Sequence, residues 1–319
     1  MYTEIIIIAL TSFLISALCG PLFIRYSRKI QFQQHIRDDG PKTHLSKKGT
    51  PTMGGLVFIG ATLLSLIVWA HLDYFLLLAV LVTVCSGLIG WLDDYFKVTR
   101  SSGIKARTKL LGQLVLTVLI VYFLNYLGHP TEIVLPITQS TLEIGPFYPL
   151  LVFFMLSGTT NAVNLTDGID GLAAGSSIIA LMAFMVLASM AGEEGITLFC
   201  AALVGGVFGF LIYNLHPAKL FMGDVGSLSL GGAMAVAAIL LKHEITLVII
   251  GGLFILETLS VMLQVFFYKI TGKRVFLMSP LHHHYELKGW SEWQVVTFLW
   301  AIAFLFALVG LLEATGGWF

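Results

Sequence analysis

Five aspartates stand beside long apolar segments of this chain. They are Asp93 and Asp94 in GWLDDYFK, Asp167 and Asp170 in NLTDGIDG, and Asp224 in FMGDVGS. Carboxylates at a membrane boundary are costly unless they meet water, a partner or a metal ion. Mg²⁺ binds few carboxylates directly and shares its other positions with waters and substrate phosphates. The aspartates therefore predict a Mg²⁺-dependent site for phosphates, and hydrated helix ends at a membrane interface are the alternative.

The spacing of these residues suggests that they have different roles. Asp93 and Asp94 are adjacent, so on a helix their side chains point about 100° apart. One can face the reacting atoms while the other holds a lysine or a metal ion. Asn164, Asp167 and Asp170 follow one another at steps of three, so on a helix they would share a face.

Asp224 lies just before Gly226 and Ser227, where we expect a helix to begin. The free N–H groups of a helix N-terminus bind phosphate. A metal-binding aspartate beside such a terminus suits a Mg²⁺–diphosphate. Phe221 precedes it by three residues and could stack on a base, or it could be an interfacial aromatic residue.

Three histidines, His282, His283 and His284, stand together in PLHHHYE. Histidine can bind phosphate oxygens or carry protons near neutral pH, and no cysteine or spaced second ligand favours a zinc site. The segment DDGPKTHLSKKGTPTMGG contains Lys42 and further lysines, which could meet an anionic substrate or only set the membrane orientation. The chain lacks the G-x-x-x-x-G-K-[ST] element of P-loop ATPases. Cations and carboxylates together indicate phosphoryl transfer.

The elements that carry these residues must be membrane helices. The 319 residues are 57% hydrophobic and 11% charged, whereas soluble domains have about 25% charged residues. Zero formal net charge argues against a nucleic-acid partner. Cys19, Cys85 and Cys200 lie in apolar segments and are interpreted as packing residues. We expect one polytopic all-α domain, 1–319, with ten spans of roughly 20 residues: 3–24, 52–70, 74–92, 110–127, 148–163, 172–191, 196–215, 227–241, 245–268 and 293–312.

The basic residues predict the sidedness of these helices. Seventeen of the 18 fall in loops that follow odd-numbered spans, and the even loops hold only Lys242. The positive-inside rule places the odd loops in the cytoplasm and both termini outside. The first arginine, Arg25, follows the first apolar run, so no signal peptide is predicted. All the chemical groups named above then lie on the cytoplasmic face.

With these residues assembled, the chain resembles the phospho-N-acetylmuramoyl-pentapeptide-transferase family over nearly its whole length. This family belongs to the polyprenyl-phosphate N-acetylhexosamine-1-phosphate transferase superfamily. The motifs that carry the resemblance are GPKTHLSKKGTPTMGG (40–55), LDDYFK (92–97), NAVNLTDGIDGLA (161–173), FMGDVGS (221–227) and PLHHHYE (280–286). The Asp-Asp pair indicates the superfamily, and PLHHHYE points to the muramoyl-pentapeptide branch.

The resemblance implies a reaction and a location. UDP-MurNAc-pentapeptide would give its phospho-sugar to undecaprenyl phosphate with Mg²⁺, yielding lipid I and UMP at the cytoplasmic face of the bacterial inner membrane. It also implies a homodimer. Asp224 would be the Mg²⁺ ligand and Asp93 the base toward the lipid phosphate, while Asp94 would support the site by orienting Lys109. His283 is expected among the catalytic residues. The other substrate-binding residues would be Lys42, Lys109, Asn164, Asp167, Asp170, Asn214, Phe221, His282 and His284.

Two other functions compete with this interpretation. A relative that uses UDP-GlcNAc would differ in the histidine loop. A transporter for an anionic lipid or nucleotide would place its polar residues near the membrane midplane, where Glu257 is the one acidic residue well inside a span. We interpret Glu257 as a packing or kink residue paired internally, with a role in a lipid groove as the alternative. The sequence leaves a one-step transfer and a two-step route through a phospho-aspartate both open.

Overall fold

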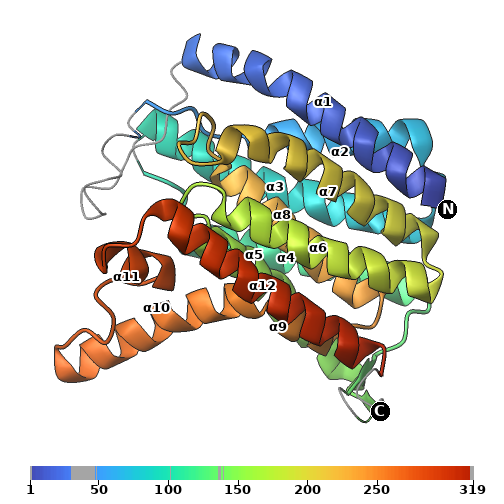
Figure 1. Ribbon diagram of the computed structural model, residues 1–319. Coiled ribbons are helices and arrows are strands. Elements are labelled where there is room, and N and C mark those ends of the chain that lie inside the picture. Colours follow the sequence, from blue (N-terminus) through green and yellow to red (C-terminus); the bar gives the residue numbers. More distant parts are fainter. Residues whose placement is uncertain are drawn as a thin grey trace.

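The structure is a computed structural model in which nearly the whole chain is helical (Figure 1). It describes residues 2–29, 47, 49–100, 102–135, 138 and 140–316. Lys42, which we expected to bind substrate, lies outside these residues. The helices of the first half are α1 (Tyr2–Lys29), α2 (Gly55–Trp69), α3 (Tyr74–Arg100), α4 (Ala106–Tyr126) and α5 (Tyr148–Thr166). Those of the second half are α6 (Leu172–Ala191), α7 (Glu194–Asn214), α8 (Gly223–Leu240), α9 (Glu244–Ile250), α10 (Gly252–Thr271), α11 (Leu281–Leu287) and α12 (Glu292–Ala314).

This is a multi-pass membrane fold. Among the described residues, 8 helices are long and apolar enough to cross a membrane, and α2 is a shorter apolar helix of 15 residues. Each predicted span corresponds to one helix, except that 245–268 is divided between α9 and α10. The short predicted spans 148–163 and 227–241 extend into flanking polar residues: α5 reaches Thr166 and α8 begins at Gly223.

The centre of the bundle is formed by α7 and α8. Every residue of α8 is buried, and α8 packs against α3 and α5 while α7 packs against α1 and α6. Small residues permit this close approach, as is usual between membrane helices. At Gly231 of α8, for example, a side chain would run into the backbone of Thr160 on α5.

The outer helices present apolar side chains away from the protein. α1 exposes a stripe of leucines, including Leu14, Leu18 and Leu22, and α10 exposes Met262 and Phe266. In water such surfaces would be unfavourable, whereas lipid chains solvate them without cost. The burial gradient therefore agrees with a membrane location.

The prediction of one continuous helix over 245–268 is wrong. The chain bends at Gly251 and Gly252, where α9 ends and α10 begins, and α10 then leaves the bundle (Figure 1). A side chain at Gly252 would collide with the ring of Phe306 on α12. Paired glycines are a common cause of helix kinks, and the apolar pattern does not reveal the bend.

The candidate catalytic aspartates lie at one end of the bundle. The N- and C-terminal ends of the described chain lie on the same side of the bundle, the C-terminal end near the hairpin of β1 (Glu132–Val134) and β2 (Thr141–Glu143), whereas α11 lies at the opposite side (Figure 1). The C-terminal end of α3 and the N-terminal end of α8 also lie at that opposite side, so the aspartates in the last turns of α3 and the first turn of α8 share it.

Candidate active site

Two lysines join the aspartates of α3 and α8. Lys97 Nζ lies 2.7 Å from Asp93 Oδ2 and 2.8 Å from Asp224 Oδ1. Lys109 Nζ, at the start of α4, lies 2.8 Å from Asp93 Oδ2 and 2.6 Å from Asp224 Oδ2. The backbone N–H of Ile104 donates to the other oxygen of Asp93 at 2.7 Å. The two ammonium groups thus hold two carboxylates that would otherwise repel each other.

Asp94 has a different main partner from Asp93, as the helix geometry predicts, although Lys97 Nζ also lies 4.0 Å from Asp94 Oδ1. Asp94 Oδ2 accepts the backbone N–H of Val225 at 3.1 Å. The expectation that Asp94 orients Lys109 is wrong, because Lys109 contacts Asp93 and Asp224 instead. Asp94 points from α3 toward the first turn of α8, whereas Lys109 approaches from α4.

Glycines allow α3 and α8 to meet at this point. A side chain at Gly90 would collide with the backbone carbonyl of Asp224. Gly223 has φ +74°, which L-residues rarely adopt, and its Cα faces the carboxylate of Asp94. The helix begins at Gly223 rather than near Gly226, so Asp224 belongs to the first turn of α8 and does not precede the helix.

The donor set at this end of the bundle fits a divalent cation. Asp167 adds a fourth carboxylate: burial, and then the negative charges of Asp224, Asp94 and Asp170, raise its pKa well above the usual range. Four carboxyl groups, those of Asp93, Asp94, Asp167 and Asp224, lie near two ammonium groups, so oxygen ligands outnumber the cations that pair with them. Several carboxyl oxygens at one point are what Mg²⁺ sites in phosphoryl-transfer enzymes provide.

The expected helix face of Asn164, Asp167 and Asp170 does not form. α5 ends at Thr166, and the chain turns through a left-handed Gly171 with φ +82° before α6 begins. Asn164 remains on α5 and donates from Nδ2 to Ser227 Oγ of α8 at 2.9 Å. Asp170 is carried by the turn into a second cluster.

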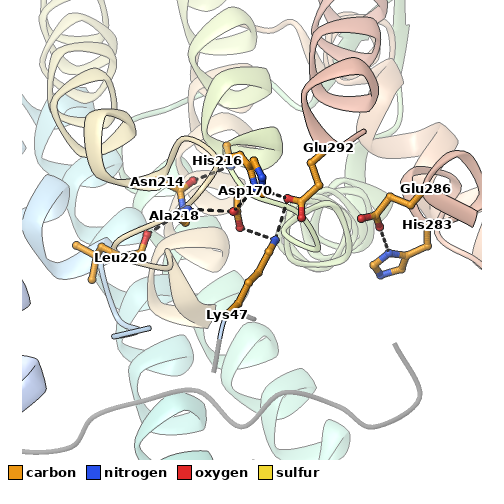
Figure 2. Close-up of polar contacts among 10 residues, drawn as sticks. Lys47, Asp170, Asn214, His216, Ala218, Leu220, His283, Glu286 and Glu292 are labelled. Atoms are coloured by element: carbon orange, nitrogen blue, oxygen red, sulfur yellow. Dashed lines mark hydrogen bonds and ion pairs between the residues drawn. The ribbon is translucent and has the colours of Figure 1, made fainter. Parts of the chain in front are cut away.

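This second cluster joins four separate segments of the chain (Figure 2). Lys47 Nζ lies 2.8 Å from Asp170 Oδ1 and 2.8 Å from Glu292 Oε2 of α12. His216 Nδ1 lies 3.0 Å from Asp170 Oδ2 and 3.2 Å from Glu292 Oε2, and the N–H of Ala218 donates to Asp170 at 3.0 Å. Asp170 and Glu292 are both buried, so their charges depend on these partners.

Asp170, His216 and Glu292 also have the spacing of a metal site, with their ligand atoms within 4.8 Å of one another. Here Lys47 and His216 serve two carboxylates, whereas four carboxyl groups stand near the two lysines around Asp224. We therefore interpret this cluster as an internal ion-pair network that fixes the turn carrying Asp170, and the aspartates around Asp224 as the group with more oxygens to offer a metal ion.

Asn214 is the last residue of α7, and Phe221 lies in the loop that follows. The amide of Asn214 accepts the N–H of Gly171 at 3.1 Å and donates to Leu220 O at 3.0 Å (Figure 2). Asn214 thus ties the 167–171 turn to the loop before α8. The backbone of Phe221 donates to Pro51 O and accepts from Gly54 N–H, each at 2.8 Å, and its ring is half-buried.

The three histidines have three different environments. His282 is fully buried and its Nδ1 lies 3.2 Å from Glu257 Oε2. His283 Nδ1 lies 2.7 Å from Glu286 Oε2 (Figure 2). His284 Nδ1 accepts the N–H of Leu277 at 3.1 Å, and burial, followed by the charge of Lys288, lowers the pKa of His284.

Four residues of these clusters were missing from the expected site. Lys97 follows Asp93 by one helical turn, and that spacing could have identified it. Lys47 was named only as part of a basic segment. No sequence pattern indicated His216 or Glu292, because their partners lie far away in the sequence.

The chain matches known proteins over nearly its full length. It is 51% identical over 313 residues to a phospho-N-acetylmuramoyl-pentapeptide-transferase of Bacillus cytotoxicus, with 96% of this chain and 97% of the relative covered. The enzyme of that name from a Geobacillus species is 50% identical, with 98% of each chain covered, and that from Bacillus thuringiensis is 52% identical, with 96% and 97% covered. The chain belongs to the phospho-N-acetylmuramoyl-pentapeptide-transferase family.

Two family models match segments that contain residues of the site. The model described as glycosyl transferase family 4 matches residues 76–242, which include the aspartates and lysines around Asp224. The model described as phospho-N-acetylmuramoyl-pentapeptide-transferase signature 1 matches residues 47–59. That signature begins at Lys47 of the second cluster, and its backbone bonds to Phe221. The expected membership of the muramoyl-pentapeptide branch is confirmed.

Proposed function

We propose that this transferase moves phospho-MurNAc-pentapeptide from UDP-MurNAc-pentapeptide to undecaprenyl phosphate, yielding lipid I and UMP in peptidoglycan synthesis. The observation that supports it best is the cluster of Asp93, Asp94 and Asp224 with Lys97 and Lys109 at one end of a membrane bundle. Such a site can meet a soluble nucleotide and a membrane-held phosphate together, and a family member needs both.

Asp224 is proposed as the Mg²⁺ ligand, with the neighbouring carboxylates of Asp94 and Asp167 as the groups that share the cation's charge. The ion would neutralise diphosphate oxygens during transfer. The described structure supports this through its excess of carboxyl groups over ammonium groups in the cluster.

Lys97 and Lys109 are proposed to bind phosphate oxygens when substrate is present. Each now contacts Asp93 and Asp224 at 2.6–2.8 Å, and ammonium groups exchange carboxylate for phosphate partners readily. Asp93 is proposed to accept the proton of the lipid phosphate. In the one-step version, the phosphate oxygen of the lipid then forms a bond to the β-phosphorus while the bond from that phosphorus to the UMP oxygen breaks.

The donor nucleotide is proposed to lie between the loop before α8 and the 167–171 turn. Phe221 would stack on the uracil, and Asn164 and Asp167 would lie beside the ribose and diphosphate. Asp170, whose two oxygens are bonded to Lys47, His216 and Ala218, would hold the turn next to them. Lys42, His282, His283 and His284 are proposed to contact phosphate or sugar. The amide of Asn214 is already bonded on both sides, so we propose that it shapes this pocket by holding its two loops.

We infer that the site faces the cytoplasm of the bacterial inner membrane and that both termini lie outside. The basic residues of the odd loops support this orientation. The soluble donor is made where nucleotides are available, which agrees with a cytoplasmic site. We also propose that the protein forms a homodimer, because the family resemblance implies one.

UMP release by the purified protein tests this function. With UDP-MurNAc-pentapeptide and undecaprenyl phosphate, UMP and a lipid-linked muramoyl product should appear in equal amounts, and omission of the lipid should stop release. UDP-GlcNAc offered at the same concentration should give no product. Turnover of UDP-GlcNAc alone, or no turnover of either donor by folded protein, would refute the proposed function.

A further inference from the structure

Glu257 and His282 form a buried pair that the proposed reaction does not yet use. Glu257 lies on the part of α10 next to the bundle and His282 on α11, and neither side chain is exposed. Glu257 Oε2 and His282 Nδ1 are 3.2 Å apart. The prediction that Glu257 pairs internally is confirmed, and its partner comes from the histidine loop.

The pair is incompletely satisfied. Within the part of the chain that the structure describes, neither Glu257 Oε1 nor His282 Nε2 has a hydrogen-bond partner. A buried polar atom without a partner lowers stability, and apolar side chains in place of a buried ionic pair are often neutral or stabilising. Fold stability therefore does not account for this pair.

His282 Nε2 points at the turn that carries the donor-site aspartates. A side chain at Gly168 would collide with Nε2 and with the neighbouring ring carbon of His282. Gly168 directly follows Asp167 in NLTDGIDG. The unpartnered nitrogen is thus directed, from a fully buried ring, toward the backbone beside Asp167.

The geometry of the ring depends on Glu257. When the carboxyl group of Glu257 is ionised it only accepts hydrogen bonds, and the tautomer of His282 that suits it carries its hydrogen on Nδ1. This bond fixes the direction of the second nitrogen, as a buried carboxylate does for the histidine of a catalytic triad. On α11 itself, the ring of His283 packs against that of His282 with the ring centroids 4.2 Å apart, a contact that bonds neither nitrogen of His282.

We propose that Glu257 is a positioning residue, an inference that rests on the proposed transferase function: it orients His282 so that Nε2, which the Asp167–Gly168 turn covers in the described structure, meets a donor phosphate or sugar oxygen when that turn shifts to admit the donor. The atom that completes the hydrogen bonding of His282 is then supplied by the bound donor. Glu257 itself does not touch the substrate.

Three variants test this role by the kcat and KM of UMP release and by the midpoint of thermal unfolding. Glu257→Gln retains an oxygen that accepts from Nδ1, whereas Glu257→Leu has a similar size and cannot accept. Glu313→Leu is the matched control, because Glu313 is a buried acid of α12 that accepts from Thr246 Oγ1 and lies outside the site.

We expect Glu257→Leu to lower kcat about 10- to 100-fold, the usual effect of losing a carboxylate that orients a functional histidine. Its thermal midpoint should be no lower than that of the wild type, and Glu257→Gln should stay within about threefold of wild-type kcat. Combining Glu257→Leu with His282→Ala should cost no more than His282→Ala alone, because coupled residues are not additive. Glu313→Leu should keep wild-type kcat.

Three results would overturn the positioning role: wild-type kcat in Glu257→Leu, equal losses in the Gln and Leu variants, or a loss that follows a reduced thermal midpoint. The wild-type reaction separates this inference from the function it rests on. If the wild type releases no UMP, the proposed function fails; if it is active and Glu257→Leu is equally active, only the positioning role fails.

Discussion

Lys109 on α4 places its ammonium group 2.6 Å from Asp224 Oδ2 on α8. The same nitrogen lies 2.8 Å from Asp93 Oδ2 on α3. Three helices that are separate in the sequence thus meet at one lysine. Because metal, donor and lipid phosphate must all come to this point in the proposed reaction, the contacts of Lys109 give the first prediction.

Lys109→Met should lower kcat for UMP release by about 10²- to 10³-fold, the usual effect of removing one preorganised electrostatic group from a transition state. The variant keeps the length of the side chain and loses its charge. Lys105→Met is the control, because Lys105 is exposed and only precedes α4. Comparable kcat values for the two variants would contradict the assignment of Lys109 to the phosphate site.

Lys47→Met should destabilise the protein, because it leaves Asp170 and Glu292 buried with one cation fewer. Breaking a buried pair by removing one partner costs about 3–5 kcal/mol, which should appear as a lower midpoint of thermal unfolding. Adding Glu292→Gln removes the excess negative charge and should restore much of the loss. An unchanged midpoint in Lys47→Met, or no recovery in the double variant, would contradict the ion-pair network.

Gly90→Ala should lower both stability and activity. The added methyl group would meet the backbone carbonyl of Asp224, which cannot move without shifting the first turn of α8. Overpacking of this kind costs about 1–3 kcal/mol. Gly60→Ala is the matched control: no atom lies within 4 Å of its added methyl group, so the thermal midpoint should stay the same or rise. Equal midpoints for the two variants would show that α3 and α8 do not meet as described.

The proposed orientation predicts which side of the membrane a thiol reagent can reach. In a chain whose three cysteines are replaced by alanine, Lys273→Cys lies between α10 and α11 and Thr141→Cys lies in the hairpin, both exposed. An impermeant maleimide should label Thr141→Cys in spheroplasts and Lys273→Cys only after permeabilisation. Labelling in the reverse order would invert the orientation.

Much of the fold and part of the site could be predicted from the sequence. Apolar length located the spans, and the helical rotation between Asp93 and Asp94 predicted that they would meet different neighbours. That rotation could not say which helix each would face, so the pairing of Asp94 with Lys109 was wrong. Helix packing, which local spacing does not encode, decided it.

The turn after α5 is a second feature that local sequence patterns did not predict. Asn164, Asp167 and Asp170 have a helical spacing, yet the chain leaves the helix at Thr166 and turns at Gly171. Glycines such as Gly168 and Gly171 are typical of a turn, but the partners of Asp170, which are Lys47 and the 216–218 loop, are set by tertiary contacts. For the same reason, no local pattern indicated Glu292 or the bend at Gly251.

The dependence of UMP release on Mg²⁺ concentration, measured for the wild type and for Asp224→Asn, tests the central claim most directly. If Asp224 binds the ion, release by the wild type should need Mg²⁺ and stop on chelation. Asp224→Asn, of the same size, should need far more Mg²⁺ or lose release altogether while remaining folded. Wild-type release that persists in a chelator, or a variant with the same Mg²⁺ dependence and kcat as the wild type, would contradict the assignment of the aspartate cluster as the metal site.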